Sequence, residues 1–180
     1  MAGTVPVSGW RPSARSSDGG IDEVPLPVAT GRLWLCGKHV VGPDPDAAMA
    51  RIGATTIVCL NERQELEERY PDYVAWLRSG APDRALWFPV PDLHAPALTL
   101  VRPLLDELTA RLGRGDGLLI HCGAGMGRAG TIGACVLIMM GVERDEALHA
   151  VAAARPTAGP EVGAQRDLVD ALVGSRRSSP

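Results

Sequence analysis

Short apolar runs alternate along the chain with longer segments whose apolar residues recur every three or four positions. The short runs predict buried strands, and they lie at residues 32–36, 54–60, 85–90 and 117–122. The longer segments predict helices, and they lie at residues 45–52, 65–79, 100–112, 128–140, 145–154 and 160–173. Strands that alternate with helices predict a single α/β domain, in which a mostly parallel, twisted central sheet has helices on both faces.

Proline and glycine mark where several of the predicted helices begin and end. Asp44 and Pro45 are suited to cap and to open the first helix, and Gly53 is suited to end it. Pro71 interrupts the second helical segment. Gly113 ends the leucine-rich third segment. These residues therefore support the boundaries that the apolar pattern predicts.

The two ends of the chain differ in composition from its middle. Residues 1–24 are rich in Pro, Ser, Gly and Arg without any periodicity, and residues 174–180 have the same character. We therefore predict a flexible N-terminal arm over residues 1–24, a folded domain over residues 25–173 and a flexible tail over residues 174–180.

Composition and charge limit the classes of function. Hydrophobic residues make up 46% of the chain, which is typical of a globular protein. The net charge is -3 and no basic stripe is visible, so we expect no nucleic-acid partner. No run of about 18 apolar residues is present, and the N-terminus lacks the apolar run of a secretory signal. We therefore expect a cytoplasmic protein without a membrane partner; the oligomeric state stays unknown.

The four cysteines are spaced widely, with no C-x-x-C pair. This spacing does not indicate a zinc site, and no other cluster of ligands indicates a metal. In a cytoplasmic protein the cysteines are expected to be free thiols. Cys36 and Cys135 fit buried core positions, whereas Cys122 stands between a predicted strand and a glycine-rich segment.

The segment IHCGAGMGRAG at residues 120–130 fits two motifs. Its second half matches G-x-G-x-x-G, a dinucleotide-binding pattern, whereas Cys122 and Arg128 bracket five residues in a C-x-x-x-x-x-R pattern. The dinucleotide motif needs a further strand that ends in an acidic residue roughly 20 residues on. After Met140 the chain has a turn and the start of a helix instead. We therefore favour the second motif and expect no cofactor.

A cysteine, a glycine-rich loop and an arginine in this order suit chemistry on phosphate. A loop between a strand and a helix can turn its backbone N–H groups inward around an anion, and the helix adds the positive end of its dipole. Arg128 can hold two phosphate oxygens in a planar fork. The same positive field would stabilise a thiolate on Cys122 for attack on phosphorus. The predicted phosphate-binding residues are Gly123, Ala124, Gly125, Met126, Gly127 and Arg128.

The pattern His121-Cys122-(five residues)-Arg128 resembles the signature of the cysteine-dependent protein tyrosine phosphatases. Its flanks resemble the dual-specificity branch, in particular the cyclin-dependent-kinase-associated phosphatase type, and the resemblance covers roughly residues 26–173. It implies a protein-tyrosine-phosphatase-like fold. It also implies hydrolysis of phosphotyrosine and phosphoserine or phosphothreonine through a phosphocysteine on Cys122. The expected substrate is a phosphorylated protein or a small phosphate ester.

The resemblance also implies roles for residues outside the signature. A general acid is expected on an upstream loop, where Asp92 follows a predicted strand; an ordinary loop or cap aspartate is the alternative. His121 is implied to hold the loop by hydrogen bonds and not to act as a base. Gln165 resembles a glutamine that lies near the attacking water, or it is a solvent-facing helix residue. His94 is expected to be an exposed loop histidine. Residues 61–63 line the pocket or, as we slightly favour, form a solvated loop.

One residue departs from the family pattern, because Ala129 stands where Ser or Thr usually follows the arginine. That hydroxyl stabilises the departing thiolate, and Thr131 lies at a helical spacing that makes it a poor substitute. We therefore expect phosphocysteine to accumulate. The alternatives are a phosphate-binding module with weak or no turnover, and another thiolate enzyme such as an arsenate reductase or a sulfurtransferase.

Two further expectations concern the substrate and the neighbouring thiols. The signature loop carries no lysine, whereas the phosphoinositide-directed branch of the family often has one, so we expect lipid substrates less than protein substrates. Cys59 ends a predicted strand, where it is either a core residue, which we favour, or a partner for a disulfide with Cys122 under oxidation.

Overall fold

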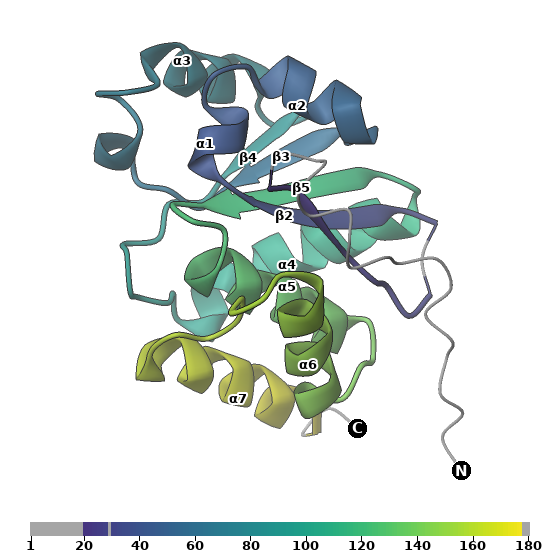
Figure 1. The fold of residues 1–180 in the computed structure, drawn as a ribbon. Coiled ribbons are helices and arrows are strands. Elements are labelled where there is room, and N and C mark those ends of the chain that lie inside the picture. The colour runs from purple at the N-terminus through teal and green to yellow at the C-terminus, as the bar shows by residue number, and fades with distance from the viewer. Residues whose placement is uncertain (1–19, 29, 178–180) are drawn as a thin grey trace.

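A five-stranded sheet crosses the middle of the molecule, and helices cover both of its faces (Figure 1). The computed structural model describes residues 20–28 and 30–177. The strands follow the order β1-β2-β5-β3-β4 and are Asp22–Val24 (β1), Arg32–Gly37 (β2), Thr56–Cys59 (β3), Ala85–Trp87 (β4) and Gly117–Cys122 (β5). Every neighbouring pair is parallel except β1, which is antiparallel to β2. The predicted α/β fold with a mostly parallel sheet is therefore confirmed.

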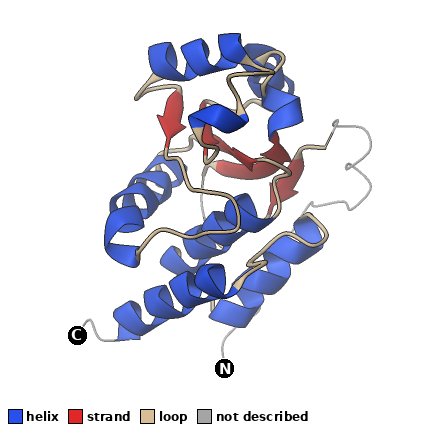
Figure 2. Ribbon diagram, turned by 90° about the vertical axis from the view of Figure 1, so that its left-hand side faces the viewer, coloured by secondary structure: helices blue, strands red, loops and turns tan. Residues whose placement is uncertain are grey.

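Among the described residues, seven α-helices form the two outer layers, which Figure 2 shows above and below the red strands. One layer consists of Lys38–Val41 (α1), Pro45–Ile52 (α2) and Pro71–Gly80 (α3), with the short 3-10 helix Arg63–Glu65 (η2) before α3. The other layer consists of Leu98–Gly113 (α4), Gly127–Met139 (α5), Arg144–Ala154 (α6) and Gly163–Arg177 (α7). None of the helices in the described part of the chain is both long and apolar enough to cross a membrane.

Alternation along the strands builds a separate core on each face of the sheet. Leu118 and Ile120 of β5 pack with residues of α4 to α7, whereas Leu119 packs with residues of α1 to α3. The small and apolar composition of α5 predicts burial on most sides, and every residue from Gly127 to Ile138 is buried. The start of α5 is therefore fixed directly behind the end of β5.

The predicted strands at residues 32–36, 54–60 and 117–122 are confirmed as β2, β3 and β5. The fourth, predicted over residues 85–90, ends earlier, at Trp87. Phe88 and Val90 still donate backbone hydrogen bonds to carbonyls at the end of β3, at 2.9 and 3.0 Å. Pro89 between them has no N–H to donate, so the regular ladder stops and the chain continues as a loop.

The helix ends follow the local signals. The side chain of Asp44 accepts a hydrogen bond from the backbone N–H of Ala47 at 2.9 Å, and Gly53 ends α2 with a φ of 72°. The helix predicted over residues 65–79 begins only at Pro71, as α3. Proline is tolerated in the first helical turn, where its missing N–H has no intrahelical acceptor.

The flexible arm predicted over residues 1–24 extends too far. Residues 22–24 form β1, and the neighbouring Ile21 and the strand residue Val24 are each only 1% exposed. A strand of three residues is too short to produce a recognisable period, so it was hidden in a segment rich in Pro, Ser and Gly. The short α1 was missed for the same reason. Residues 1–19 of the predicted arm lie outside the described residues.

The C-terminal boundary also needs correction. The last helix, predicted over residues 160–173, begins at Gly163 and continues to Arg177, so it includes the first residues of the predicted tail. Leu168, Val169 and Leu172 of this helix are buried in the core, and the helix continues past its buried part. Residues 178–180 of the predicted tail lie outside the described residues.

Candidate active site

Three segments meet at the carboxyl end of the parallel strands, which is where sheets of this type bind their ligands. Arg128 follows β5, Asp92 follows β4, and Glu65 follows β3. The structure brings their charged groups together: Nη2 of Arg128 lies 3.2 Å from Oδ1 of Asp92, and Nη1 lies 2.8 Å from Oε2 of Glu65. The three segments therefore form one site around the side chain of Arg128.

Residues 123–127, called the phosphate loop below, join β5 directly to α5. Cys122 is the last residue of β5 and is 3% exposed, and Gly127 is the first residue of α5. The loop therefore lies at the positive end of the dipole of α5. A thiol at the start of such a loop stands next to the helix end that attracts anions.

Close contacts with β2 and α1 fix the path of the phosphate loop. Gly125 has a φ of 77°, and a side chain on it would collide with the carbonyl oxygen of Cys36. Only glycine meets both requirements. The backbone N–H of Lys38 donates to the carbonyl oxygen of Gly123 at 3.1 Å. The loop is thus anchored on the side that faces β2.

Arg128 is held along one edge and is 4% exposed. Nη1 and Nη2 donate to separate carboxylate oxygens of Glu65, and Nη1 also donates to the carbonyl oxygen of Val90, each at 2.8 Å. Nε has no hydrogen-bond partner in the described part of the chain. Burial opposes the charge of Arg128, but the hydrogen bond with Glu65 and nearby negative groups raise its pKa. A fixed cation therefore presents its Nε edge to an incoming oxyanion.

Glu65 is the charged partner of Arg128 that the sequence analysis missed. It ends η2, and it accepts hydrogen bonds from the side chain of Asn61 and from the backbone N–H of Glu62, each at 2.8 Å. Burial alone would raise the pKa of Glu65, but these bonds and those from Arg128 outweigh it and lower the pKa below its ordinary value. Glu65 therefore faces Arg128 as a carboxylate.

The segment after β3 is only partly the solvated loop that we favoured for residues 61–63. Arg63 is exposed, but Asn61 is fully buried and supports Glu65. A buried polar residue at a strand end, followed within one turn by an acidic residue, was the available signal for this support. The alternative, that the segment lines the pocket wall, describes Asn61 better.

Asp92 lies on an exposed loop between β4 and α4. Its side chain is 70% exposed. The backbone carbonyl oxygen of Asp92 lies 2.7 Å from Nδ1 of His94, which is an exposed residue as expected. Leu93 between them has a φ of 56°, which is uncommon for a residue with a side chain. The loop thus presents the carboxyl group of Asp92 to solvent at the edge of the site.

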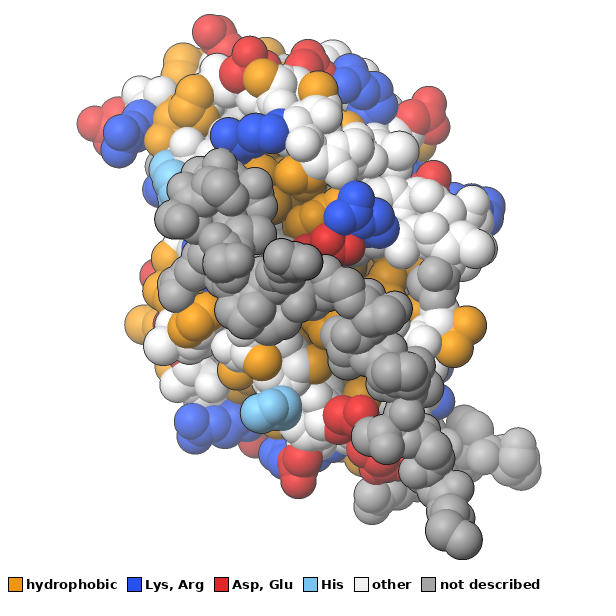
Figure 3. Space-filling view, turned by 45° about the vertical axis from the view of Figure 1, so that its right-hand side comes forward, with side chains coloured by type: hydrophobic (Ala, Val, Ile, Leu, Met, Phe, Trp, Pro, Cys, Tyr) orange, Lys and Arg blue, Asp and Glu red, His pale blue; other side chains and the backbone are white. Residues whose placement is uncertain are grey.

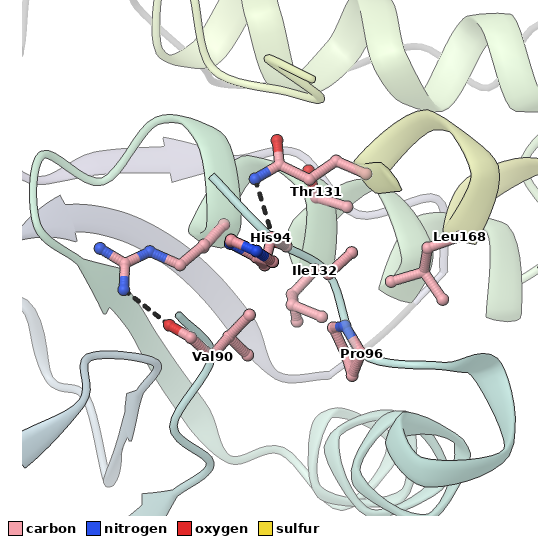
Figure 4. A pocket seen from close by; sticks show the side chains of 9 residues that line it. Val90, His94, Pro96, Thr131, Ile132 and Leu168 are labelled. Carbon is pink, nitrogen blue, oxygen red and sulfur yellow. Dashed lines mark hydrogen bonds between the residues drawn. The ribbon is translucent and has the colours of Figure 1, made fainter. Parts of the chain in front are cut away.

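Gln165 connects this loop to α7. Its Nε2 donates to the carbonyl oxygen of His94 at 3.3 Å, and its Oε1 accepts from the backbone N–H of Glu161 at 2.8 Å. Gln165 is 1% exposed, so the alternative of a solvent-facing helix residue is wrong. The pocket beside it is largely apolar, and Figure 4 shows that Pro96 and Ile132 converge in it. Packing and one amide therefore hold the loop of Asp92 in place.

His121 is fully buried beneath the phosphate loop. Its Nε2 lies 2.6 Å from the hydroxyl of Tyr73, and its Nδ1 lies 3.4 Å from the carbonyl oxygen of Cys122. Burial lowers the pKa of His121 to about 4, so the ring is neutral at neutral pH. These contacts are those of a supporting residue at the base of the loop.

The four cysteines are free thiols in the structure. Cys36 and Cys59 pair with His121 from the two neighbouring strands and pack with α1 to α3, whereas Cys122 packs in the opposite core. A disulfide between Cys59 and Cys122 would thus have to cross the sheet, so the core position that we favoured for Cys59 describes it. Burial raises the pKa of Cys59 and of Cys135 to about 12, which keeps both thiols protonated.

The surface and the ligand clusters add two observations. On the face that Figure 3 shows, acidic and basic side chains are interspersed and no stripe of one sign is present among the residues described there. Within the described ranges, no group of three or more His, Cys, Asp or Glu side chains is placed to hold a metal ion.

Comparison with known proteins gives a family and several similar folds. The family whose model matches residues 31–178 is the DSP-PTPase phosphatase domain of the Swiss Army Knife type, PTP-SAK. No curated protein matches the sequence. The structure of Tk-PTP in its active form is 25% identical with a TM-score of 0.63, over 84% of this chain and 95% of that one.

Two other solved structures share the fold at lower identity. Kinase-associated phosphatase (KAP), with its catalytic-site cysteine replaced by serine, is 19% identical with a TM-score of 0.72, over 89% of this chain and 97% of that one. Human DUSP28 is 20% identical with a TM-score of 0.64, over 84% of this chain and 96% of that one.

Proposed function

The chain belongs to the family of DSP-PTPase phosphatase domains, and from this premise we propose that it hydrolyses phosphate monoesters through a phosphocysteine on Cys122. Arg128 and the backbone N–H groups of the phosphate loop bind the phosphate, and Asp92 acts as general acid and general base. The observation that carries the proposal is the 3.2 Å approach of Arg128 to the exposed carboxylate of Asp92, beside the loop that follows Cys122.

The charge pattern around Arg128 supports phosphate binding. Glu65 neutralises one edge of the guanidinium from a partly buried position, whereas Asp92 reaches the other side from solvent. An exposed carboxylate can move aside when a dianion arrives, because an ion pair in water is worth little. Phosphate oxygens would then accept hydrogen bonds from Nε and Nη2 of Arg128.

In the first chemical step, the sulfur of Cys122 attacks phosphorus in line with the leaving oxygen. The S–P bond forms, the P–O bond to the leaving group breaks, and protonated Asp92 gives its proton to the leaving oxygen. The phosphate loop and Arg128 stabilise the charge on the non-bridging oxygens. The exposed position of Asp92 suits contact with a leaving group that extends into solvent.

In the second step, a water molecule attacks the phosphocysteine on Cys122. The carboxylate of Asp92 accepts a proton from the water, the P–O bond forms, the S–P bond breaks, and inorganic phosphate and the thiolate are released. The phosphate loop stabilises that thiolate through the dipole of α5. Gln165 bonds His94 on the loop of Asp92, so it supports the acid that acts in this step.

Phosphotyrosine and phosphoserine or phosphothreonine in proteins are the proposed substrates. The acid loop is exposed at Asp92, Leu93 and His94, and a site with an open rim accepts both long and short phosphorylated side chains. The phosphate loop carries no lysine that would favour a second phosphate group on a lipid headgroup. Phosphopeptides of each type and a phosphoinositide are therefore the substrates to compare.

The proposal is tested by the turnover of para-nitrophenyl phosphate. The wild type is expected to be active, Cys122→Ser to be inactive and Asp92→Asn to be strongly impaired. Cys135→Ala is the matched control, because it removes a cysteine from the core at α5 and should leave turnover unchanged. An inactive wild type would exclude the enzyme, and full activity of Cys122→Ser would exclude the mechanism.

A phosphate-binding module with weak turnover is a second candidate, which one observation favours. Ala129 is fully buried and has no hydroxyl, and the hydroxyl of Thr131 already donates to the carbonyl oxygen of Gly127 at 2.7 Å. The thiolate of Cys122 thus lacks the hydroxyl donor that usually follows the arginine. Tight binding of inorganic phosphate without multiple turnovers would favour this candidate.

A further inference from the structure

The outer side of the phosphate loop is bound by an arginine that the mechanism above does not use. Arg155 follows α6, and its Nη2 donates to the carbonyl oxygen of Ala124 at 2.7 Å. Its Nη1 donates to Oδ2 of Asp22 at 2.5 Å and to the carbonyl oxygen of Gly20 at 2.9 Å. One guanidinium therefore joins the middle of the phosphate loop to β1, which lies more than one hundred positions earlier in the sequence.

We infer that Arg155, held by Asp22, is a positioning residue that sets the conformation of the phosphate loop for oxyanion binding. This inference rests on the proposed function. A loop that turns its N–H groups toward an anion must turn its carbonyl groups away from it. A bond that holds the carbonyl of Ala124 on the outer side therefore favours the binding conformation before the anion arrives.

The burial of the pair argues that its geometry matters more than its contribution to stability. Arg155 is 8% exposed and Asp22 is 5% exposed. A buried ion pair loses the solvation of both charges, so it is weak evidence for stability, and precise placement is a reason to have one. The planar fork of arginine can bond two separate groups at once, which the ammonium of lysine does less well.

The segment that follows Arg155 binds the neighbouring part of the loop. The hydroxyl of Thr157 lies 2.9 Å from Sδ of Met126, and the backbone N–H of Gly159 donates to the carbonyl oxygen of Met126 at 3.3 Å. These contacts hold Met126 and leave the preceding peptide group, at Ala124, to Arg155. The side chain of Arg155 is therefore the specific control of that peptide.

The test is the affinity of the full-length protein for inorganic phosphate, measured by calorimetry and by competitive inhibition of para-nitrophenyl phosphate turnover. Arg155→Met is expected to weaken phosphate binding about tenfold, the loss typical of one hydrogen bond to a charged group. Arg144→Met is the matched control. Arg144 lies at the other end of α6, where it pairs with Asp145 and Asp170, so its loss should leave phosphate affinity unchanged.

Two further variants separate placement from charge. Arg155→Lys keeps the charge and is expected to recover only part of the affinity. Asp22→Asn keeps an acceptor for Arg155 and is expected to weaken phosphate binding by about threefold, since a neutral hydrogen bond is roughly half as strong as a charged one. Chemical denaturation of each variant gives its stability, so that affinity is compared among folded proteins.

The outcomes are distinct for the two proposals. Wild-type affinity for phosphate in Arg155→Met, or an equal loss in Arg144→Met, would overturn the role of Arg155. Full recovery in Arg155→Lys would show that charge and not placement matters, and would overturn it as well. A wild type that binds no phosphate would instead overturn the proposed function.

Discussion

The inner and outer sides of the phosphate loop each carry a buried arginine, and the two arginines have different partners. On the inner side, Arg128 contacts Asp92, whose side chain is 70% exposed. On the outer side, Arg155 contacts Asp22, which is 5% exposed. Each guanidinium has an Nε without a partner among the residues described. The exposure of the carboxylate is therefore what separates a cation that can accept an incoming anion from one that is permanently paired.

This difference teaches where activity and stability should separate. Substitutions on the inner side should change chemistry more than folding, because the partner that they release is already in solvent. Substitutions on the outer side should change both, because they leave a buried group unpaired. The predictions below test the inner side in the order of their expected effects.

The largest effect is expected for Arg128→Met. The loss of the fixed cation should lower kcat/KM on the order of 10³-fold, as for the loss of a group that stabilises charge in the transition state. Steady-state kinetics with para-nitrophenyl phosphate measures it. Arg63→Met is the control, because Arg63 is exposed and pairs only with Glu67 among the residues given for its side chain. Equal losses in the two variants would mean that Arg128 has no special role.

Asp92→Asn is expected to lower kcat by about 10²-fold without a change in thermal stability. The value is typical for the loss of a general acid, and the side chain is too exposed for its charge to matter to folding. Asp106→Asn, at an exposed position of α4, should change neither quantity. A large fall in the melting temperature of Asp92→Asn would contradict the distinction between the two sides.

Glu65→Gln is expected to lower kcat/KM about tenfold, because Arg128 loses the charged half of its support. It should also change the dependence of stability on pH. The pKa of Glu65 is lowered in the folded state, so its stabilising effect is complete above the unfolded pKa of about 4.3 and is lost as the pH falls through the lower folded value. Denaturation from pH 6 downward should thus show a weaker acid dependence in Glu65→Gln than in the wild type; identical curves would refute the assignment.

The smallest effect is expected for Ala129→Ser. A hydroxyl at this buried position could donate to the thiolate of Cys122 as it leaves phosphorus, so steady-state turnover should rise by a few-fold, about the effect of one hydrogen bond. In stopped-flow experiments the wild type should show a burst of para-nitrophenolate, and the variant a smaller one. Kinetics with a single phase in both proteins would argue against slow hydrolysis of the phosphocysteine.

The inner part of the site could be predicted because its signal is contiguous in the sequence. Cys122, the glycines and Arg128 lie within seven residues, and a strand, a loop and a helix around them have clear local patterns. Asp92 could be placed because it follows a strand that belongs to the same sheet. Its neighbourhood to Arg128 followed from topology alone.

The supporting residues could not be predicted because their partners are distant in sequence. Glu65 meets Arg128 across 63 positions, and Arg155 meets Asp22 across 133. Neither has a local pattern, since a charged residue on a loop is most often solvated. Asp22 was also placed in a predicted arm, where a three-residue strand gives no period. Long-range ion pairs of this kind become visible only in the fold.

The most direct test of the central claim is to trap the covalent intermediate. The full-length protein is mixed with para-nitrophenyl phosphate, the reaction is quenched in acid within the burst, and the peptides are examined by mass spectrometry. A phosphate group on Cys122, present in the wild type and absent in Cys122→Ser, is the predicted result. Turnover of substrate by the wild type with no phosphate on Cys122 at any quench time would contradict the account.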